Sequence, residues 1–315
     1  RLQTAVRKCL QLSTDCCKGP YGPIKLWDVS AVTDMSHLFS QKLFLKSNEF
    51  IGDISTWDVS RVKTMEDMFY GAVSFNGDLS KWNVSRVTDM EQMFHEAKLF
   101  EGKLSQWDVS KVPDMRFMFL LASSFNGDLS KWDVSRVEMM AQMFRGAKMF
   151  DRDISEWDVS SVQNMYGMFY SASSFNSDIR KWDVSNVRNM YGMFYAASSF
   201  NGDISKWDVS RVQTMYAMFC EAISFNIDIS KWDVSRVQNM DSMFFDALSF
   251  KQTLCGTAWA HSKATQELMF QGSSGELSQA MCIVMPSRLE LARAVRECLK
   301  LSRKGDCGKG PFGAI

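Results

Sequence analysis

The chain lacks an excess of charge of either sign, and it lacks any long apolar run. Its 36 basic residues balance its 36 acidic residues, so the formal net charge is zero. Bulk attraction to nucleic acid or to an anionic membrane is not expected, because no sign of charge dominates the surface. Apolar runs extend over only a few residues, far short of the roughly 20 that a membrane-spanning helix needs. We expect no nucleic-acid partner and no membrane span in this segment.

Motifs that carry chemistry are also missing from the sequence. There is no G-x-S-x-G turn, no Walker phosphate-binding loop and no H-E-x-x-H pair. No two Cys have C-x-x-C spacing, and His37, His95 and His261 are scattered, which argues against a zinc site. We therefore expect no catalytic residues, no metal and no cofactor. The sequence predicts that the protein is not an enzyme.

What the sequence has in abundance is repetition, which is the signature of a stacked architecture. The Trp residues fall 25 residues apart through most of the chain, with a first step of 30 and a last step of 27. Most of the 22 Met occupy two fixed positions of the same repeat, which reads F-N-x-D-[IL]-S-x-W-D-V-S-x-V-x-x-M-x-x-M-F-x-x-A-x-x. The Trp positions are Trp27, Trp57, Trp82, Trp107, Trp132, Trp157, Trp182, Trp207, Trp232 and Trp259.

The pattern within each coil predicts a short strand followed by a short helix. Residues 54–59 are β-branched or aromatic and partly alternating, which favours a strand. After Ser60, a candidate helix N-cap, apolar residues follow at helical spacing, and Pro113 suits the first turn of such a helix. We expect Trp, both Val, both Met and both Phe of each coil to face inward. The predicted fold is a leucine-rich-repeat-like α/β solenoid of about ten coils, each with one parallel strand and one helix, closed by helical caps.

The motif W-D-V-S-x-V-x-x-M-x-x-M-F-x-x-A-x-x-F-N resembles the BspA-like repeat of Mycoplasma-type surface proteins, a 25-residue repeat family of unknown function with leucine-rich-repeat character. The resemblance covers residues 24 to 250, where consecutive coils match the motif. Members of that family are regarded as secreted or surface proteins, and no catalytic residues are associated with the repeat. The resemblance implies an extracellular or cell-surface protein with a structural or binding role, and it implies no ligand.

The two ends of the chain are similar to each other, since residues 5–24 recur in residues 294–315. We therefore expect residues 1–26 to form an N-terminal cap, 27–253 the regular coils, 254–287 a degenerate capping repeat, and 288–315 the opening of a following tandem module. The chain begins at Arg1 without an initiator Met, so we expect it to be part of a longer protein.

Seven of the eight Cys lie in these end segments, and six of them are disulfide candidates. Local pairs there would staple the caps and indicate an oxidising compartment. Cys17 and Cys220 are left over. The expected pairs are Cys9–Cys16, Cys255–Cys282 and Cys298–Cys307.

Two recurrent surface features are candidates for function. An Asp follows the turn in nearly every coil, and capping of backbone groups explains it better than a calcium loop, because Lys103 replaces it in one coil. The second feature is a concentration of Tyr in the later coils, at the position after the first Met and four residues beyond. Two interpretations stay open, namely partial burial between neighbouring helices and an aromatic patch for a partner. These residues are Tyr166, Tyr170, Tyr191, Tyr195 and Tyr216.

Two function classes follow from these observations. In the first, tandem modules form an extracellular or cell-surface fibre or coat, with other modules of the same chain and copies of itself as partners. In the second, the chain is an adhesion or recognition module that binds a protein or glycan on its concave face. The near-invariance of the coils favours the first class, because recognition surfaces usually vary from coil to coil.

Overall fold

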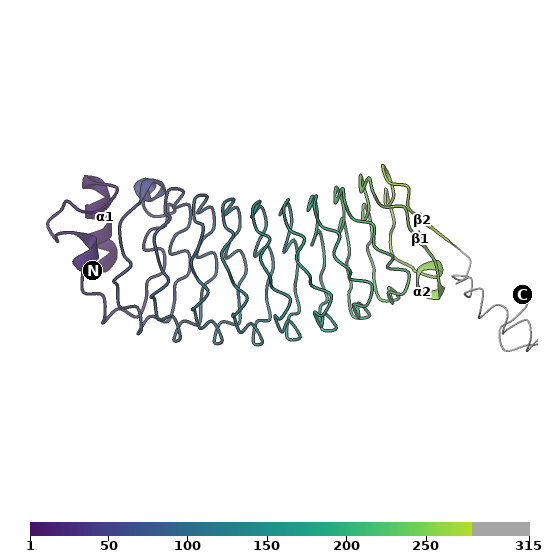
Figure 1. The fold of residues 1–315 in the computed structure, drawn as a ribbon, viewed down its shortest axis with the longest axis horizontal. Helices are drawn as coiled ribbons and strands as arrows, with labels where there is room; N and C mark the ends of the chain where they lie inside the picture. Colours follow the sequence, from purple (N-terminus) through teal and green to yellow (C-terminus); the bar gives the residue numbers. More distant parts are fainter. Residues whose placement is uncertain (279–315) are drawn as a thin grey trace, which may run out of the picture.

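The computed structural model describes residues 1–278, and it shows the coils stacked in a single elongated row (Figure 1). Helix α1 (Leu2–Leu12) stands at one end of the row, and the pair β1 (Thr253–Leu254) and β2 (Glu276–Leu277) at the other. Three short helical turns complete the regular elements: η1 (Ile24–Leu26), η2 (Leu45–Glu49) and α2 (Thr257–Ala260). The expected module opening at 288–315 lies outside the described residues.

A ladder of main-chain hydrogen bonds joins each coil to the next along the M-x-x-M-F segment. Met65, Asp67, Phe69 and Gly71 each donate an N–H to a carbonyl of the following coil, at 2.7–2.9 Å. The residues between them, Met68 and Tyr70, instead donate their N–H to a carbonyl of their own coil and so close turns. Isolated parallel bridges mark the same line, for example Thr64 with Asp89, and recur at 25-residue steps further along the row.

The prediction of one strand and one helix per coil is wrong for the described residues. No helix lies between η2 and α2, and the segment expected as a strand, 54–59, forms a turn at 55–56. The helix fails because Asp67 and Gly71 have positive φ, which an α-helix does not accept, and because alternate N–H groups bind the next coil. The N–H groups of Met68 and Ala72 bond to residues three positions back, so the segment is a chain of type II-like turns.

Pro113 shows most directly that this segment forms a ladder between coils and not a helix. The equivalent N–H groups, such as that of Glu138, donate to the coil before, and proline has none to donate. Among the described residues the bridge between Asp89 and Asp114 is accordingly missing from the ladder. Pro113 therefore interrupts a sheet-like ladder, and it does not begin a helix.

The core is a set of aromatic and methionine columns that run along the row. Phe69 stacks on Phe94 of the next coil with ring centroids 5.4 Å apart, and on Phe75 of its own coil at 4.2 Å. Neighbouring Trp rings are parallel, as for Trp82 and Trp107 at 6.4 Å. The inward direction of Trp, Val, Met and Phe is confirmed, because these side chains are almost fully buried in the regular coils, except for the half-buried Trp27 and Val32 of the first coil. The stack is therefore one continuous hydrophobic core, in which each coil covers its neighbour.

The end of the row at α1 is covered rather than left open. Val6, Cys9 and Leu10 on one face of α1 are buried against the first coil. The side chain of Gln3 donates a hydrogen bond to the carbonyl of Ser36 in that coil, at 3.1 Å. Helix α1 thus shields the apolar edge that the first coil would otherwise expose to water.

Candidate functional site

The tyrosine stripe, which we define as Tyr166, Tyr170, Tyr191, Tyr195 and Tyr216, lies on the outer side of the hydrogen-bonded ladder. The ladder fixes its spacing: the N–H of Gly167 donates to the carbonyl of Tyr191, and that of Gly192 to the carbonyl of Tyr216, both at 2.8 Å. Equivalent tyrosines of adjacent coils are therefore held next to each other. The stripe forms two rows, one with Tyr166, Tyr191 and Tyr216 and the other with Tyr170 and Tyr195.

The rings of each row are in direct contact. Tyr170 and Tyr195 stack with centroids 4.3 Å apart and parallel planes. In the other row, Tyr191 stacks on Tyr216 at 4.7 Å and meets Tyr166 edge-on at 5.0 Å. Such contacts stabilise aromatic pairs by about 0.5–1.5 kcal/mol beyond burial. The stripe is a continuous aromatic surface across three coils.

Small residues separate the two rows. Gly167, Gly192 and Ala217 occupy this position in the tyrosine coils, all with positive φ. A Cβ added at Gly192 would lie 3.6 Å from Cδ2 of Tyr170, so that ring lies close against the glycine backbone. Earlier coils carry larger side chains at the same position, namely His37, Asp67, Gln92, Phe117 and Gln142. The change to small residues coincides with the tyrosines, and it leaves space for their rings.

The stripe is neither buried nor fully open to solvent. Tyr191 is 36% exposed, and the other four tyrosines are half-buried. The hydroxyl of Tyr195 donates a 2.7 Å hydrogen bond to Glu221, and this bond raises the pKa of the tyrosine. Arg145 lies over the ring of Tyr170 at 4.4 Å and closes one end of the stripe. The expected partial burial is present, because each ring packs on its equivalent in the next coil, but the neighbours are turns and not helices.

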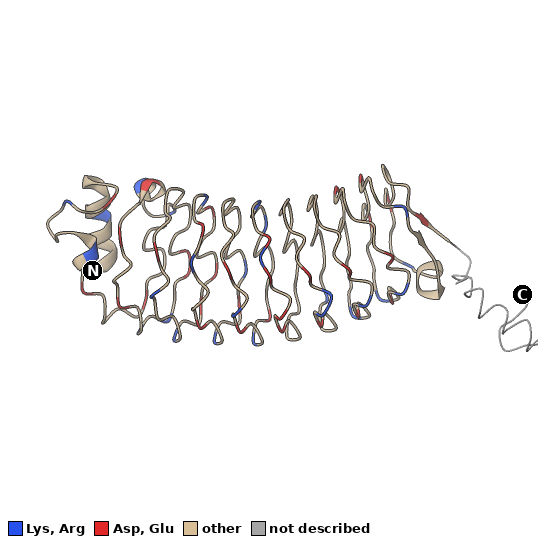
Figure 2. Cartoon of the chain, in the orientation of Figure 1, with Lys and Arg blue, Asp and Glu red and all other residues tan. Residues whose placement is uncertain are grey.

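Several earlier coils carry charged residues where the later ones carry tyrosine, although Tyr70 already occupies one of these positions. Arg116 bridges Asp114 at 2.7 Å and Glu91 at 3.2 Å. Figure 2 shows basic and acidic residues interspersed along the rest of the row, with no large region of one sign. The same face therefore changes from paired charges to aromatic rings along its length.

The recurrent Asp residues are structural, as predicted. The Asp78 carboxylate accepts the N–H of Ser80 at 3.0 Å, and Asp53, Asp128 and Asp203 do the same for the residue two positions on. Hydrogen bonds lower the pKa of each carboxyl: mainly that from Lys25 for Asp53 and that from the Ser205 side chain for Asp203, and mainly the main-chain N–H for Asp78 and Asp128. The Asp oxygens thus serve Asx turns. Ser60 is likewise held in a turn by Asp58 rather than capping a helix.

A recurrent Asn makes a contact between coils that was not predicted from the sequence. The Oδ1 atom of Asn201 accepts the N–H of Asn226 at 2.9 Å, and Asn176 binds Asn201 in the same way. The exact 25-residue spacing of these Asn was the available signal, since identical positions lie side by side in a stack.

A second contact that was not predicted from the sequence brings His37 next to Asp67. Their sequence separation of 30 equals the first Trp-to-Trp step, so both residues occupy the same position of consecutive coils. Aligning the first coil on Trp27 and Trp57 would have predicted their proximity.

The cysteines occupy several environments. Cys9 and Cys16 form a disulfide in the N-terminal cap, and Cys255 is also disulfide-bonded. Cys282, Cys298 and Cys307 lie outside the described residues. Cys17 is a free, exposed thiol, whereas Cys220 is free and buried, and burial raises its pKa to about 11. Neither free thiol is poised as a reactive nucleophile, because a lowered pKa is what activates a thiol.

In residues 1–278, no helix is both long enough and apolar enough to cross a membrane. This observation concerns the helices of the described part alone.

Comparison with known proteins gives a family and no curated relative. No curated protein matches the chain. Three overlapping stretches, residues 11–126, 100–197 and 175–281, match a family described as "Mycoplasma protein of unknown function, DUF285". These stretches include every regular coil and extend into both end segments. The chain is a tandem-repeat protein that belongs to the DUF285 family.

Proposed function

We propose that this chain is a non-enzymatic structural module of an extracellular or cell-surface protein, and that the tyrosine stripe joins copies of the protein side by side. We class the stack as a solenoid, leucine-rich-repeat-like in its parallel coils but built from turns in place of helices. In this assignment the regular coils provide length, and the stripe provides the contact between molecules.

The observation that carries this proposal is a set of ordered, partly exposed aromatic rings that pack on one another across three coils. Tyr is enriched at protein interfaces because its ring is large and amphipathic. The stripe is pre-organised, since its rings already stack on one another and lie over small residues. Little conformational entropy is lost when such a surface binds. The disulfide of Cys9 and Cys16 supports an oxidising compartment such as the cell exterior.

The test is to replace Tyr166, Tyr191 and Tyr216 together with Glu and to measure sedimentation over a range of protein concentrations. We expect the parent to self-associate and the variant to remain a monomer with a similar melting temperature. A matched control replaces the exposed Gln163, Gln213 and Gln238 with Glu, which adds the same charge to the same part of the row. This control should associate as the parent does.

Two results would contradict the proposal. One is a parent that remains monomeric at all concentrations, and the other is a tyrosine variant that associates as strongly as the parent. Electron microscopy of the native protein gives an independent check, because a fibre or coat protein should appear as filaments or sheets.

A polar cleft favours recognition as a second candidate function. The cleft has a volume of about 700 Å³, and its lining includes Asp78, Lys103, Asn126 and Arg152 from consecutive coils. Hydroxyl-rich ligands such as glycans are bound by side chains of this kind. Binding to a glycan panel that is lost in Lys103→Glu and kept in the control Lys98→Glu would support this candidate over self-association.

A further inference from the structure

Asp67 is the one charged residue in the described part of the chain whose side chain is almost completely buried. The residue is 1% exposed and lies in the second coil, beside the first. Its Oδ2 atom receives the Lys42 ammonium at 2.7 Å, whereas Oδ1 is buried without a hydrogen-bond partner. A buried carboxylate oxygen is nearly always partnered, so the orphan oxygen requires an explanation.

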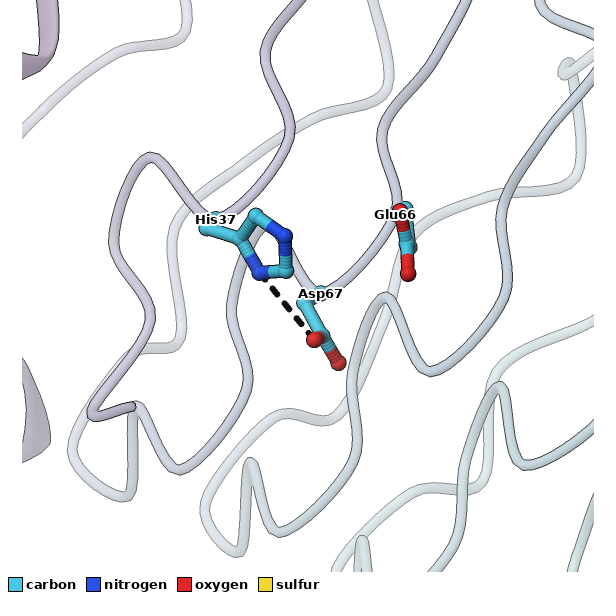
Figure 3. A group of neighbouring side chains, drawn as sticks. All are labelled: His37, Glu66 and Asp67. Atoms are coloured by element: carbon cyan, nitrogen blue, oxygen red, sulfur yellow. Dashed lines mark ion pairs between the residues drawn. The ribbon is translucent and has the colours of Figure 1, made fainter. Parts of the chain in front are cut away.

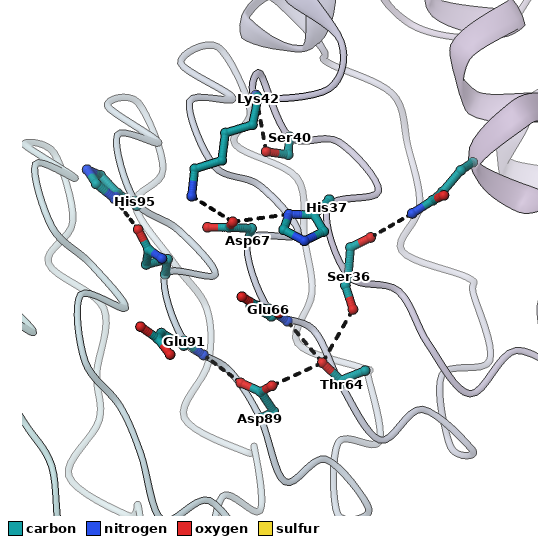
Figure 4. Close-up of polar contacts among 12 residues, drawn as sticks. Ser36, His37, Ser40, Lys42, Thr64, Glu66, Asp67, Asp89, Glu91 and His95 are labelled. Atoms are coloured by element: carbon teal, nitrogen blue, oxygen red, sulfur yellow. Dashed lines mark hydrogen bonds and ion pairs between the residues drawn. The ribbon is translucent and has the colours of Figure 1, made fainter.

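His37 lies beside the same carboxylate (Figure 3), on the side away from Lys42 (Figure 4). Its Nδ1 atom is 3.1 Å from Oδ2 of Asp67. The contact lacks hydrogen-bond geometry, however, and Nδ1 is itself a buried atom without a hydrogen-bond partner. Two ligands on one tetrahedral zinc ion lie about 3.4 Å apart, as zinc–nitrogen and zinc–oxygen bonds of about 2.1 Å require. The two atoms therefore have the separation of two ligands of one ion.

Glu66 supplies a third ligand atom. One atom each from His37, Glu66 and Asp67 lies within 4.8 Å of the others. Glu66 is half-buried, and its side chain is drawn close to that of Asp67 (Figure 4). One imidazole and two carboxylates are a donor set typical of zinc and related divalent ions, whereas calcium prefers six or more oxygens.

We propose that His37, Glu66 and Asp67 bind a single divalent transition-metal ion of the zinc type. The ion links the first coil, which carries His37, to the second coil, which carries the two carboxylates. The ion binds through both oxygens of the Asp67 carboxylate, so Oδ1 gains the partner that the protein alone does not provide. The site strengthens the row where α1 covers it. It shares no residue with the tyrosine stripe, so the two proposals stand or fall separately.

Lys42 allows a direct test of the metal site, because its ammonium competes with the ion for the Asp67 carboxylate. Lys42 is 40% exposed along its side chain and lies over the ring of Tyr70 at 4.1 Å. This position lets the ammonium remain near the aromatic ring when an ion takes its place at the carboxylate. If the cluster were only an ion pair, removal of Lys42 would leave the Asp67 carboxylate buried without a partner, and added metal would not restore the lost stability. If the cluster is a metal site, removal of Lys42 strengthens metal binding.

The experiment measures binding of Co²⁺ by its visible absorption and binding of Zn²⁺ by competition. All proteins carry Cys17→Ser, because that exposed thiol is an alternative metal ligand. We expect the parent to bind one ion, and His37→Asn and Asp67→Asn to bind at least about tenfold more weakly. Asn is a suitable replacement because it tolerates the positive φ at both positions. The matched control is Glu91→Gln, which changes the position equivalent to Glu66 one coil further on and should leave affinity unchanged.

The decisive variant is Lys42→Met. We expect it to bind Co²⁺ several-fold more tightly than the parent, to melt at a lower temperature without metal, and to regain that stability with Zn²⁺ but not with Ca²⁺. Circular dichroism shows whether each variant is folded. Absence of a Co²⁺ band in both the parent and Lys42→Met overturns the proposal. So does a band of equal strength in Asp67→Asn, which would place the ion elsewhere.

Discussion

The indole N–H of Trp107 donates a 3.0 Å hydrogen bond to the main-chain carbonyl of Leu79 in the preceding coil. The same carbonyl accepts the main-chain N–H of Trp82, at 3.1 Å. One oxygen atom thus closes a turn of its own coil and holds the next coil in place. The same bond recurs from coil to coil, for example from Trp132 to Leu104 and from Trp182 to Ile154. Tryptophan therefore sets the register of the stack as well as filling its core.

Replacement of Trp107 by Phe should lower the free energy of unfolding by about 1–3 kcal/mol, because it removes a buried hydrogen bond and part of a buried ring. Urea denaturation would measure the change. Trp27→Phe is the control, since the indole of Trp27 binds Gly22 within the cap and is only half-buried. Equal losses in the two variants would contradict a special role for the bond between coils.

Met190→Asp should unfold the coils around it. Met190 is 0% exposed, and an unpaired buried charge costs several kcal/mol. Thermal melting followed by circular dichroism would show a large decrease or an additional early transition. Met149→Asp makes the same chemical change at a methionine that is 57% exposed, and it should melt as the parent does. A Met190→Asp protein that melts like the parent would show that the core assignment is wrong.

Asn201 should be replaceable by Asp but not by Ala. Asn201→Ala removes the acceptor of the Asn226 N–H and should cost about 0.5–1.5 kcal/mol. Asn201→Asp keeps an acceptor in place, as Asp151 does when its carboxylate accepts the N–H of Asn176 at 2.9 Å. Denaturant midpoints of the two variants would compare them directly. Similar losses in both would mean that the Asn ladder depends on the amide group itself.

The protein should become less stable as the pH is lowered below 6.5, because of His95. Burial, followed by the charge of Lys42, lowers the pKa of His95 from 6.5 to about 4. The unfolded chain therefore binds this proton more readily than the folded chain, so the contribution is complete above pH 6.5 and is lost as pH falls toward about 4. Melting temperatures across this interval should decrease less steeply in His95→Gln. The exposed His261 is the control, and an unchanged slope in His95→Gln would contradict the assignment.

Reduction of the Cys9–Cys16 disulfide should loosen α1 and leave the central coils intact. A bridge that closes so short a loop contributes about 2 kcal/mol in the chain-entropy account. Hydrogen exchange with and without reductant would report faster exchange at Val6 and Leu10, and little change near Phe144. Peptide mapping without reductant would test the bond itself. A free thiol at Cys9 would remove the support for an oxidising compartment.

The sequence by itself determined the repeat, the length of each coil and the side chains that face inward. Met65, Met68, Phe69 and Ala72 were expected on one face, and all four are 0% exposed. The inference succeeded because apolar side chains must be buried whichever backbone conformation brings them together. The same spacing of three and four residues occurs in a helix and in a chain of four-residue turns, so it does not distinguish them.

Only the tertiary structure decided the backbone conformation, because the partner of each N–H group lies in another coil. The N–H of Asp67 binds the carbonyl of Glu91, and no local pattern shows this choice. The same is true of function. His37 meets Asp67, and Tyr170 meets Tyr195, only because the coils stack in one particular register. Local propensities describe how neighbours in the chain behave, whereas both candidate sites are made by residues that stacking alone brings together.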